Sequence, residues 1–338
     1  MSSIKRKLIF IVLIIAILTI AVFLAIKICD KRISQMPEGK FGVTFSIGRA
    51  EYLGLDWHDT YSSILDELQV KYLRLGAYWP NIMPKKDVYN FSDLDWMVNE
   101  AGNHQAKIIL AIGWRLPGWP ECHTPDWATN LSEQERQEQI SNLIKETVNR
   151  YKLDPQISAW QVENEPFLRT FGICPPINRD FFKQELALVK SLDDRPIIVT
   201  ESGELSTWLG GGHHGDVLGI TMYRVVWNKY IKYFYYPFPE ASYYLKGEIV
   251  KLLTGVKKII VAELQAEPWS PNGSLLTMSL DEQLKVVNLD YMKNVVSYAR
   301  HTGFSEYYLW GVEWWYWLKN QGHPEVFNFV QELFKSQL

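Results

Sequence analysis

The chain has 338 residues, of which 47% are hydrophobic and 22% are charged. This composition excludes a disordered polymer and a multi-span membrane protein, and it predicts a substantial buried core. The net charge is −3, but the first 32 residues carry six basic residues against one acidic residue, so the remainder is distinctly acidic. An acidic body lacks the basic surface that nucleic-acid binding requires, and we therefore expect no nucleic-acid partner.

A hydrophobic run begins at Leu8 and ends at Ile26, interrupted only by Thr19. In a helix this run spans about 28 Å, close to the hydrocarbon thickness of a bilayer. No small-residue cleavage site follows it, and the flanking basic residues favour a cytoplasmic N-terminus. The sequence thus predicts a transmembrane signal anchor within residues 1–30, a juxtamembrane linker over residues 31–40, and an extracytoplasmic domain that the anchor holds at the lipid bilayer of the cell membrane.

Eight short apolar runs recur along the rest of the chain, and helix-forming segments separate most of them. The runs begin at Phe41, Tyr72, Lys107, Ile157, Pro196, Val217, Lys257 and Glu306. The segments predict helices over residues 59–68, 92–104, 132–152, 178–192 and 280–302, with Ser132 and Glu135 spaced as a capping box. Eight strand and helix units predict an α/β fold, a (β/α)₈ TIM barrel over residues 41–338. An open sheet is the alternative, but the sequence has neither a G-x-G-x-x-G turn after the first strand nor a Walker motif to favour it.

Acidic residues follow two of the predicted strands. The fourth run ends in W-Q-V-E-N-E-P, which contains Glu165, and the seventh in A-E-L-Q-A-E-P-W, which contains Glu263. The carboxyl ends of barrel strands meet at one mouth, where strands four and seven face each other. Two opposed carboxyl groups are what glycosidic cleavage requires. Glu163 and Glu267 are rival candidates in the same segments. Further acidic residues are expected to bind substrate or support the site: Glu201, Glu204 and Glu313.

Through these two motifs the chain resembles the clan A glycoside hydrolases from about Phe41 to its C-terminus. The resemblance implies that Glu165 is the acid/base, that Glu263 is the nucleophile, and that the anomeric configuration is retained. It also implies roles in the site for four further residues: Arg74, Asn164, Tyr223 and Trp310. Arg74 and Tyr223 would stabilise the charge of Glu263, while Asn164 would hydrogen-bond the sugar 2-hydroxyl group.

Tryptophan residues at the ends of the strands are candidate platforms for sugar rings. Trp310 offers an apolar face to a pyranose ring, and Trp114 and Trp269 lie in loops at the expected mouth. Core packing is the alternative for each of them. Many families of the clan carry His or Asn at the end of strand three, where this chain has Gly113 and Trp114, so the sugar specificity stays open.

The cysteine and histidine residues suggest a disulfide but no metal site. Cys122 and Cys174 follow adjacent strands, and we predict a disulfide between them, with two free buried thiols as the alternative. No H-E-x-x-H or C-x-x-C pattern is present, so we expect neither a metal nor another cofactor.

Together these features predict a membrane-anchored retaining glycosidase that cleaves a β-linked oligo- or polysaccharide through a covalent glycosyl-enzyme. A non-catalytic carbohydrate-binding barrel and a transglycosylase with the same site are the alternatives. A metal-dependent barrel enzyme is disfavoured, because no His-x-His follows the first strand, where Phe45 and Ser46 stand. The sugar, the linkage, endo or exo action and the oligomeric state stay open.

Overall fold

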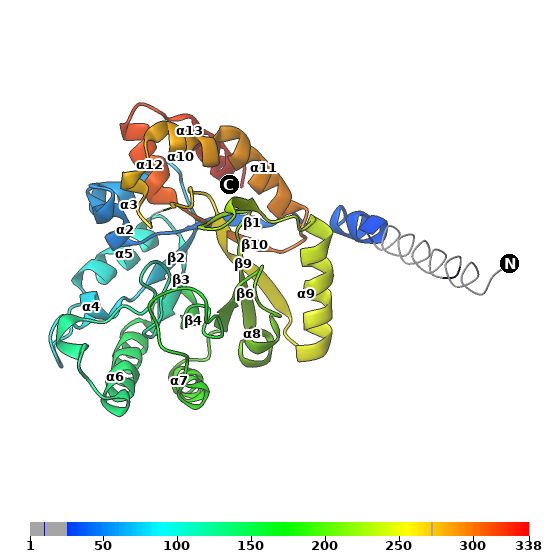
Figure 1. Ribbon diagram of the computed structural model, residues 1–338. Helices are drawn as coiled ribbons and strands as arrows, with labels where there is room; N and C mark the ends of the chain where they lie inside the picture. Colours follow the sequence, from blue (N-terminus) through cyan, green and yellow to red (C-terminus); the bar gives the residue numbers. More distant parts are fainter. Residues whose placement is uncertain (1–9, 11–25, 272, 338) are drawn as a thin grey trace.

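The computed structural model describes residue 10, residues 26–271 and residues 273–337 (Figure 1). At its centre eight parallel strands close into a barrel in the order β1-β2-β3-β4-β5-β6-β9-β10. These strands are β1 (Lys40–Thr44), β2 (Tyr72–Gly76), β3 (Lys107–Ile112), β4 (Ile157–Val162), β5 (Ile197–Glu201), β6 (Val217–Met222), β9 (Lys258–Gln265) and β10 (Glu306–Trp310). Each begins within two residues of a predicted run, and the predicted TIM barrel is confirmed.

Helices surround the strands on the outside of the barrel (Figure 1). They are α2 (Ile47–Tyr52), α3 (Trp57–Asp66), α4 (Trp79–Ile82), α5 (Ser92–Asn103), α6 (Glu133–Tyr151), α7 (Arg179–Leu192), α8 (Leu209–His214), α9 (Glu240–Thr254), α10 (Leu280–Val286), α11 (Leu289–Arg300), α12 (Val312–Asn320) and α13 (Glu325–Lys335). The predicted capping box of Ser132 and Glu135 is present at the start of α6. The helix predicted over residues 280–302 is instead two helices, because the Asn288 side chain accepts the backbone N–H of Tyr291 and begins α11.

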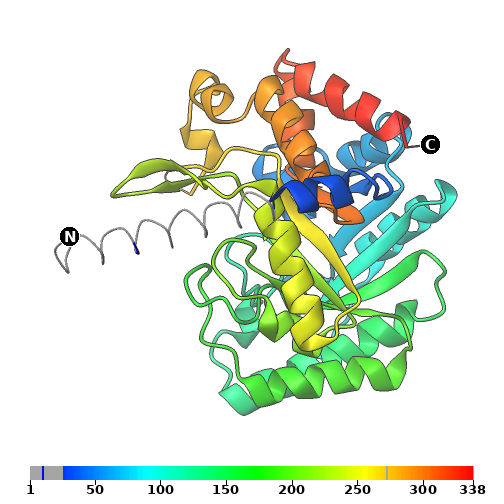
Figure 2. The same ribbon diagram turned by 90° about the vertical axis from the view of Figure 1, so that its right-hand side faces the viewer.

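Two predicted strands end earlier than the sequence pattern suggested. The sixth run divides into β6 and β7 (Val225–Asn228), which forms an antiparallel hairpin with β8 (Lys232–Tyr235) that projects beyond the barrel (Figure 2). The eighth run stops at Trp310, where Gly311 adopts a φ of 123° and α12 begins. Glu313 therefore lies on α12.

The barrel interior and the space between strands and helices form two apolar regions. Six buried side chains from six neighbouring strands, β3 to β6, β9 and β10, fill the base of the barrel: Ile109, Ala159, Ile198, Val217, Ile260 and Tyr308. A larger cluster packs the outer faces of the strands against the helices. Strand side chains alternate between the inside and the outside of the barrel, so the next inward positions toward the mouth include Arg74 and Gln161. The polar residues of the mouth therefore lie directly above the apolar residues at the base of the barrel.

Before the first barrel strand, residues 26–33 form a helix. Cys29 and Ile33 of this helix pack against Ala241 and Tyr244 of α9. Figure 1 shows the helix beside one end of α9. The segment just before the barrel therefore lies against the helix that connects β6 to β9.

The predicted localisation, a single-pass membrane protein with an extracytoplasmic domain, is wrong on the structure. Among residues 10, 26–271 and 273–337, no helix is long and apolar enough to cross a bilayer. The run on which that prediction depended, from Leu8 to Ile26, lies outside the described residues apart from its members Phe10 and Ile26.

Candidate active site

Glu263 lies at the mouth of the barrel and is held by two donors. Arg74 Nη1 donates to its Oε1 at 2.9 Å, and the Tyr223 hydroxyl donates to its Oε2 at 3.1 Å. The Arg74 side chain is 0% exposed and Glu263 is 6% exposed, so the ion pair is desolvated. Burial, and then the charge of Glu263, raise the pKa of Tyr223 well above its usual value. Tyr223 therefore stays a hydroxyl donor, and Glu263 is stabilised as a carboxylate.

A β-bulge places Glu263 in this position. Ile220 of β6 pairs with Val261 of β9, but the next residue, Thr221, pairs with Glu263, so that Ala262 is left without a partner on β6. An extra residue of this kind bends a strand and redirects the side chain that follows. The bulge thus sets the direction of Glu263, which strand alternation alone does not determine.

Arg74 also fixes the polar groups on the β4 side of the mouth. Its Nε donates to Gln161 Oε1 at 2.7 Å and its Nη2 to Asn164 Oδ1 at 2.8 Å. Asn164 Oδ1 accepts further bonds from Gln161 Nε2 and Thr200 Oγ1. Arg74, Asn164, Tyr223 and Glu263, predicted from separate strands, therefore form one hydrogen-bonded network.

Glu165 differs from Glu263 in forming no ion pair with any cation in the part of the chain that the structure describes. It is 6% exposed, and its buried Oε1 has no hydrogen-bond partner among the described residues. Burial raises its pKa well above the usual value, and the charges of Glu263 and Glu121 raise it further. The site thus contains one carboxyl group bound by a cation and a hydroxyl donor, and one whose pKa is raised by burial.

Glu163, a rival candidate, has both carboxylate oxygens committed to the backbone. They accept the N–H groups of Trp114 and Arg115, each at 2.7 Å. Gly113 makes room for this carboxylate, because a Cβ on Gly113 would lie 2.3 Å from Glu163 Oε1. The glycine at the end of strand three is therefore explained by the position of Glu163.

Glu267, the other rival, is bound at one oxygen by two donors. Arg49 Nη2 donates to its Oε1 at 2.7 Å, and Trp310 Nε1 donates to the same atom at 2.9 Å. These contacts orient the Trp310 ring, which remains half-buried at the end of β10. Glu267 therefore supports the predicted sugar platform.

The remaining acidic candidates bind the backbone of neighbouring segments. Glu204 accepts the Tyr223 N–H at 2.8 Å and the Tyr243 hydroxyl at 2.7 Å, and burial raises its pKa to about 7. Glu201 accepts the Gly211 N–H. Glu313 accepts the Ser46 N–H, with its pKa raised by burial to about 8. Of these three, Glu204 contacts a residue of the network around Glu263.

Aromatic rings extend from Tyr223 across the mouth. Trp269 packs edge-on against Tyr223 with 5.5 Å between ring centroids, Phe171 lies 5.6 Å from Trp269, and Trp119 lies 5.9 Å from Phe171. Trp114 is placed differently, because its Nε1 donates to Thr124 and its ring packs against the core. The structure therefore brings Trp269 to the site but directs Trp114 toward its own loop.

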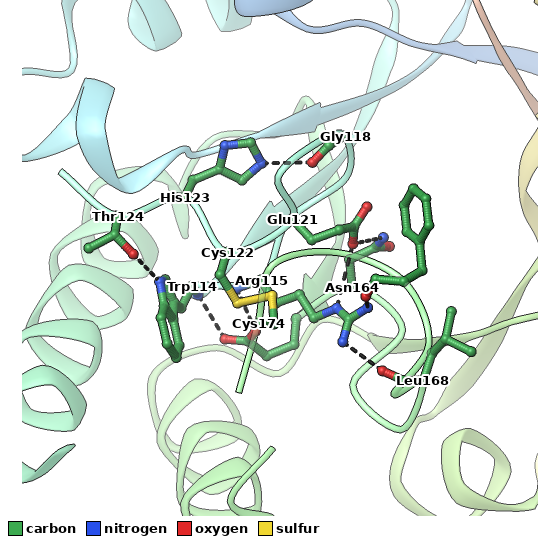
Figure 3. The surroundings of a disulfide bond; sticks show 12 residues. Trp114, Arg115, Gly118, Glu121, Cys122, His123, Thr124, Asn164, Leu168 and Cys174 are labelled. Atoms are coloured by element: carbon green, nitrogen blue, oxygen red, sulfur yellow. Dashed lines mark hydrogen bonds and ion pairs between the residues drawn. A yellow bond between two sulfur atoms is a disulfide. The ribbon is translucent and has the colours of Figure 1, made fainter. Parts of the chain in front are cut away.

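The predicted disulfide between Cys122 and Cys174 is confirmed, and it joins the loops that follow β3 and β4 (Figure 3). Arg115 reinforces this link by donating from Nη1 to the Leu168 carbonyl and from Nη2 to the Phe171 carbonyl. These two loops carry Glu165 and the aromatic ring that reaches Trp269, so their joint position shapes the mouth.

Comparisons with known proteins find similarity to glycoside hydrolases. The family model "Glycosyl hydrolase family 10" matches residues 76–181, which include Asn164 and Glu165. Mannan endo-1,4-beta-mannosidase F of Aspergillus clavatus is 27% identical over 113 residues, which cover 32% of this chain and 26% of that protein. Probable mannan endo-1,4-beta-mannosidase A-2 of Aspergillus terreus is 25% identical over 145 residues, covering 38% of this chain and 36% of that protein. The chain thus matches only about a quarter to a third of these relatives' length.

Solved structures share the fold at low sequence identity. Xylanase 10B of Thermotoga maritima superposes with a TM-score of 0.55 at 16% identity, over 80% of this chain and 82% of that chain. GH5_18 of Bifidobacterium longum subsp. longum gives a TM-score of 0.57 at 16% identity, over 81% and 70% of the two chains. These structures show the barrel fold, and with the family match over residues 76–181 they confirm the resemblance to the clan A glycoside hydrolases. Together with the family match, it supports a glycosidase.

Sequence reasoning missed three site residues: Arg115, Glu121 and Phe171. Glu121 adjoins Cys122, so the predicted disulfide already placed it beside the loop after β4. Arg115 and Phe171 gave no comparable signal. Arg115 binds backbone carbonyl groups and Phe171 packs against Trp269, and no sequence spacing predicts contacts of these kinds.

Proposed function

We propose that the protein is a retaining β-glycoside hydrolase with Glu263 as nucleophile and Glu165 as acid/base. The observation that carries this proposal is the contrast between the two carboxyl groups. Glu263 is bound by Arg74 and Tyr223, whereas Glu165 has a buried oxygen without a hydrogen-bond partner in the described part of the chain, and a raised pKa. Retaining hydrolysis needs one ionised and one protonated carboxyl group.

In the proposed first step Glu263 attacks the anomeric carbon while Glu165 gives its proton to the departing glycosidic oxygen. This step forms a glycosyl ester on Glu263 and leaves Glu165 ionised. In the second step Glu165 takes a proton from water, the resulting hydroxide attacks the anomeric carbon, and Glu263 departs as a carboxylate. Arg74 and Tyr223 support Glu263 as its charge is lost and regained, and Asn164 bonds the 2-hydroxyl group in the transition state.

The proposed substrate is a β-linked oligo- or polysaccharide. The row of rings from Tyr223 through Trp269 and Phe171 offers apolar surface for several sugar units beside the carboxyl pair. The names of the partial relatives point to β-1,4-mannan, and the structural neighbours include a xylanase.

A substrate panel tests this proposal. The purified full chain is incubated with mannan, xylan and β-glucan and with 4-nitrophenyl β-mannoside, β-xyloside and β-glucoside. We expect new reducing ends from at least one of them, with the β-anomer formed first in NMR spectra. First formation of the α-anomer would contradict retention, and binding without release of reducing ends would support the non-catalytic alternative.

A further inference from the structure

Glu121 is a third buried carboxyl group beside the proposed catalytic pair, and the mechanism above does not use it. It lies in the loop after β3, is 3% exposed, and adjoins the disulfide cysteine Cys122 (Figure 3). The charge of Glu121 raises the pKa of Glu165, and the charge of Glu263 raises the pKa of Glu121. Glu121 is therefore part of the same electrostatic site as both proposed catalytic residues.

Glu121 is bonded directly to Asn164. Asn164 Nδ2 donates to Glu121 Oε2 at 3.0 Å, and Arg115 Nε lies 3.5 Å from the same oxygen. The carbonyl oxygen of Asn164 is already occupied by three donors, from Arg74, Gln161 and Thr200. The second N–H of the Asn164 amide has no partner among the described residues, so it is available to a ligand held beside Glu121.

The surrounding backbone holds Glu121 in place. Its φ is 73°, and Gly172 packs so closely that a Cβ there would lie 2.8 Å from the Cβ of Glu121. The Ile173 N–H donates to the Pro120 carbonyl at 2.9 Å, and the disulfide follows at the next residue. Contacts between the loops after β3 and β4 thus fix the position of Glu121. A ligand-binding group needs a fixed position of this kind.

Burial, and then the charge of Glu263, raise the pKa of Glu121 to about 8. At neutral pH the side chain is therefore mainly a neutral acid. Its carbonyl oxygen can accept the Asn164 bond while its hydroxyl donates to a second oxygen. A neutral acid beside the Glu263 anion also avoids placing two like charges together.

We propose that Glu121 is a specificity-determining residue that, together with Asn164, binds the oxygen at position 2 of the sugar whose glycosidic bond is cleaved. This inference rests on the proposed function, because it places that sugar against Glu263. Glu121 would add a second polar contact to the 2-oxygen, beside that of Asn164, and would make the enzyme selective for sugars that carry a hydroxyl group at position 2.

The test compares substrates with and without the 2-hydroxyl group. The full chain is assayed at pH 6 with 4-nitrophenyl β-D-glucoside, β-D-mannoside and the 2-deoxy compound common to both. For Glu121→Ala we expect kcat/KM to fall about 10- to 100-fold on whichever 2-hydroxy substrates are cleaved. On the 2-deoxy substrate we expect a change within about threefold. Glu121→Gln, which keeps one acceptor and one donor, should retain most of the activity at pH 6.

Several outcomes overturn the inference. An equal fall on both substrates in Glu121→Ala would mean that Glu121 only supports the loop, and an unchanged rate would mean that it does not contact substrate. Glu138→Ala, on the exposed face of α6, is the control for handling and expression. If the wild-type chain cleaves none of these compounds or the polysaccharides, the proposed function fails and the inference fails with it. That pattern is distinct from selective loss in the variants.

Discussion

At the scale of single residues, the site is organised by a buried guanidinium. Arg74 donates to the side chains of Gln161, Asn164 and Glu263, which come from β4, the loop after it, and β9. A buried charge is costly unless its hydrogen bonds are satisfied, and here a carboxylate and two amide oxygens satisfy it. The same bonds that stabilise Arg74 therefore position the groups proposed to bind sugar.

The Tyr223 hydroxyl provides a first prediction. Tyr223→Phe removes the donor to Glu263 Oε2 while it keeps the ring that packs against Trp269. Hydrogen bonds to charged groups contribute about 1.5–3 kcal/mol, so we expect kcat to fall about 10- to 100-fold, with little change in stability. Steady-state kinetics and thermal melting measure both effects. Tyr235→Phe, at an exposed tyrosine of the β7–β8 hairpin, should leave kcat unchanged.

The raised pKa of Glu165 predicts the alkaline limb of the pH profile. As the proposed acid, Glu165 has to carry its proton in the first step, so kcat/KM should fall as the pH rises through this raised pKa. In Glu165→Gln the limb should disappear for 2,4-dinitrophenyl glycosides, whose leaving group needs no proton. Persistence of the same alkaline limb in this variant would assign it to another group.

At the scale of elements, the loops after β3 and β4 act as one unit. The disulfide between Cys122 and Cys174 closes a segment with a sequence separation of 52 residues, and Arg115 binds two carbonyl groups of the second loop. This unit lies over the mouth, because Phe171 contacts Trp269 and Gly118 lies beside Trp310.

Removal of the disulfide should therefore lower both stability and activity. For a loop of this length, chain entropy gives about 4 kcal/mol. We expect the double variant Cys122→Ser with Cys174→Ser to lose stability by about that amount in urea unfolding, and kcat/KM to fall as Glu121 and Phe171 lose their fixed positions. Wild-type protein reduced with dithiothreitol should match the variant. Equal stability of the oxidised and reduced proteins would show that the other contacts hold the loops.

A second pair of acidic residues links α7 to the end of β4. Glu185 and Glu163 are both buried, burial raises the pKa of each, and Glu163 raises that of Glu185 further. The folded protein therefore keeps a proton that the unfolded chain releases above pH of about 4.3. Stability that depends on this proton is fully present below that pH and is lost as the pH rises through the raised pKa.

Glu185→Gln should remove this pH dependence, because its amide donates to Glu163 without a titrating proton. We expect the variant to be more stable than the wild type by about 1–3 kcal/mol at pH 8, with the difference vanishing toward pH 4. Urea unfolding at several pH values measures it. Glu138→Gln, at an exposed position of α6, is the matched control. A difference that does not change with pH would mean that the pair does not share a proton.

At the scale of the whole molecule, the barrel could be predicted because its signals are local and repeated. Each of the eight apolar runs contains one of the eight barrel strands, and capping residues such as Ser132 marked helix starts. The β7–β8 hairpin was hidden in the sixth run, since its residues continue the same apolar pattern as β6. The long helix α9, which lies between β8 and β9 in the chain, was not predicted from the sequence either.

The site was only partly predictable for a related reason. Strand ends and the two acidic motifs pointed to Glu165 and Glu263, because a barrel brings strand ends together, whereas Arg74 and Tyr223 came from the resemblance to the clan A glycoside hydrolases. The contact between Glu121 and Asn164 depends on how two loops fold over the mouth. The conformation of such loops depends on tertiary contacts, which the hydrophobic pattern of a single segment does not predict.

The stereochemistry of azide rescue tests the proposed roles of the two carboxyl groups most directly. In Glu263→Ala, azide should occupy the vacated space and attack an activated β-glycoside from that side, giving the α-glycosyl azide. In Glu165→Ala, a 2,4-dinitrophenyl glycoside should still form the glycosyl-enzyme on Glu263, and azide should then attack from the opposite side and give the β-glycosyl azide. NMR of the products from both variants distinguishes these outcomes. The account predicts opposite anomers, whereas the same anomer from both variants, or near-wild-type turnover in either without azide, would contradict it.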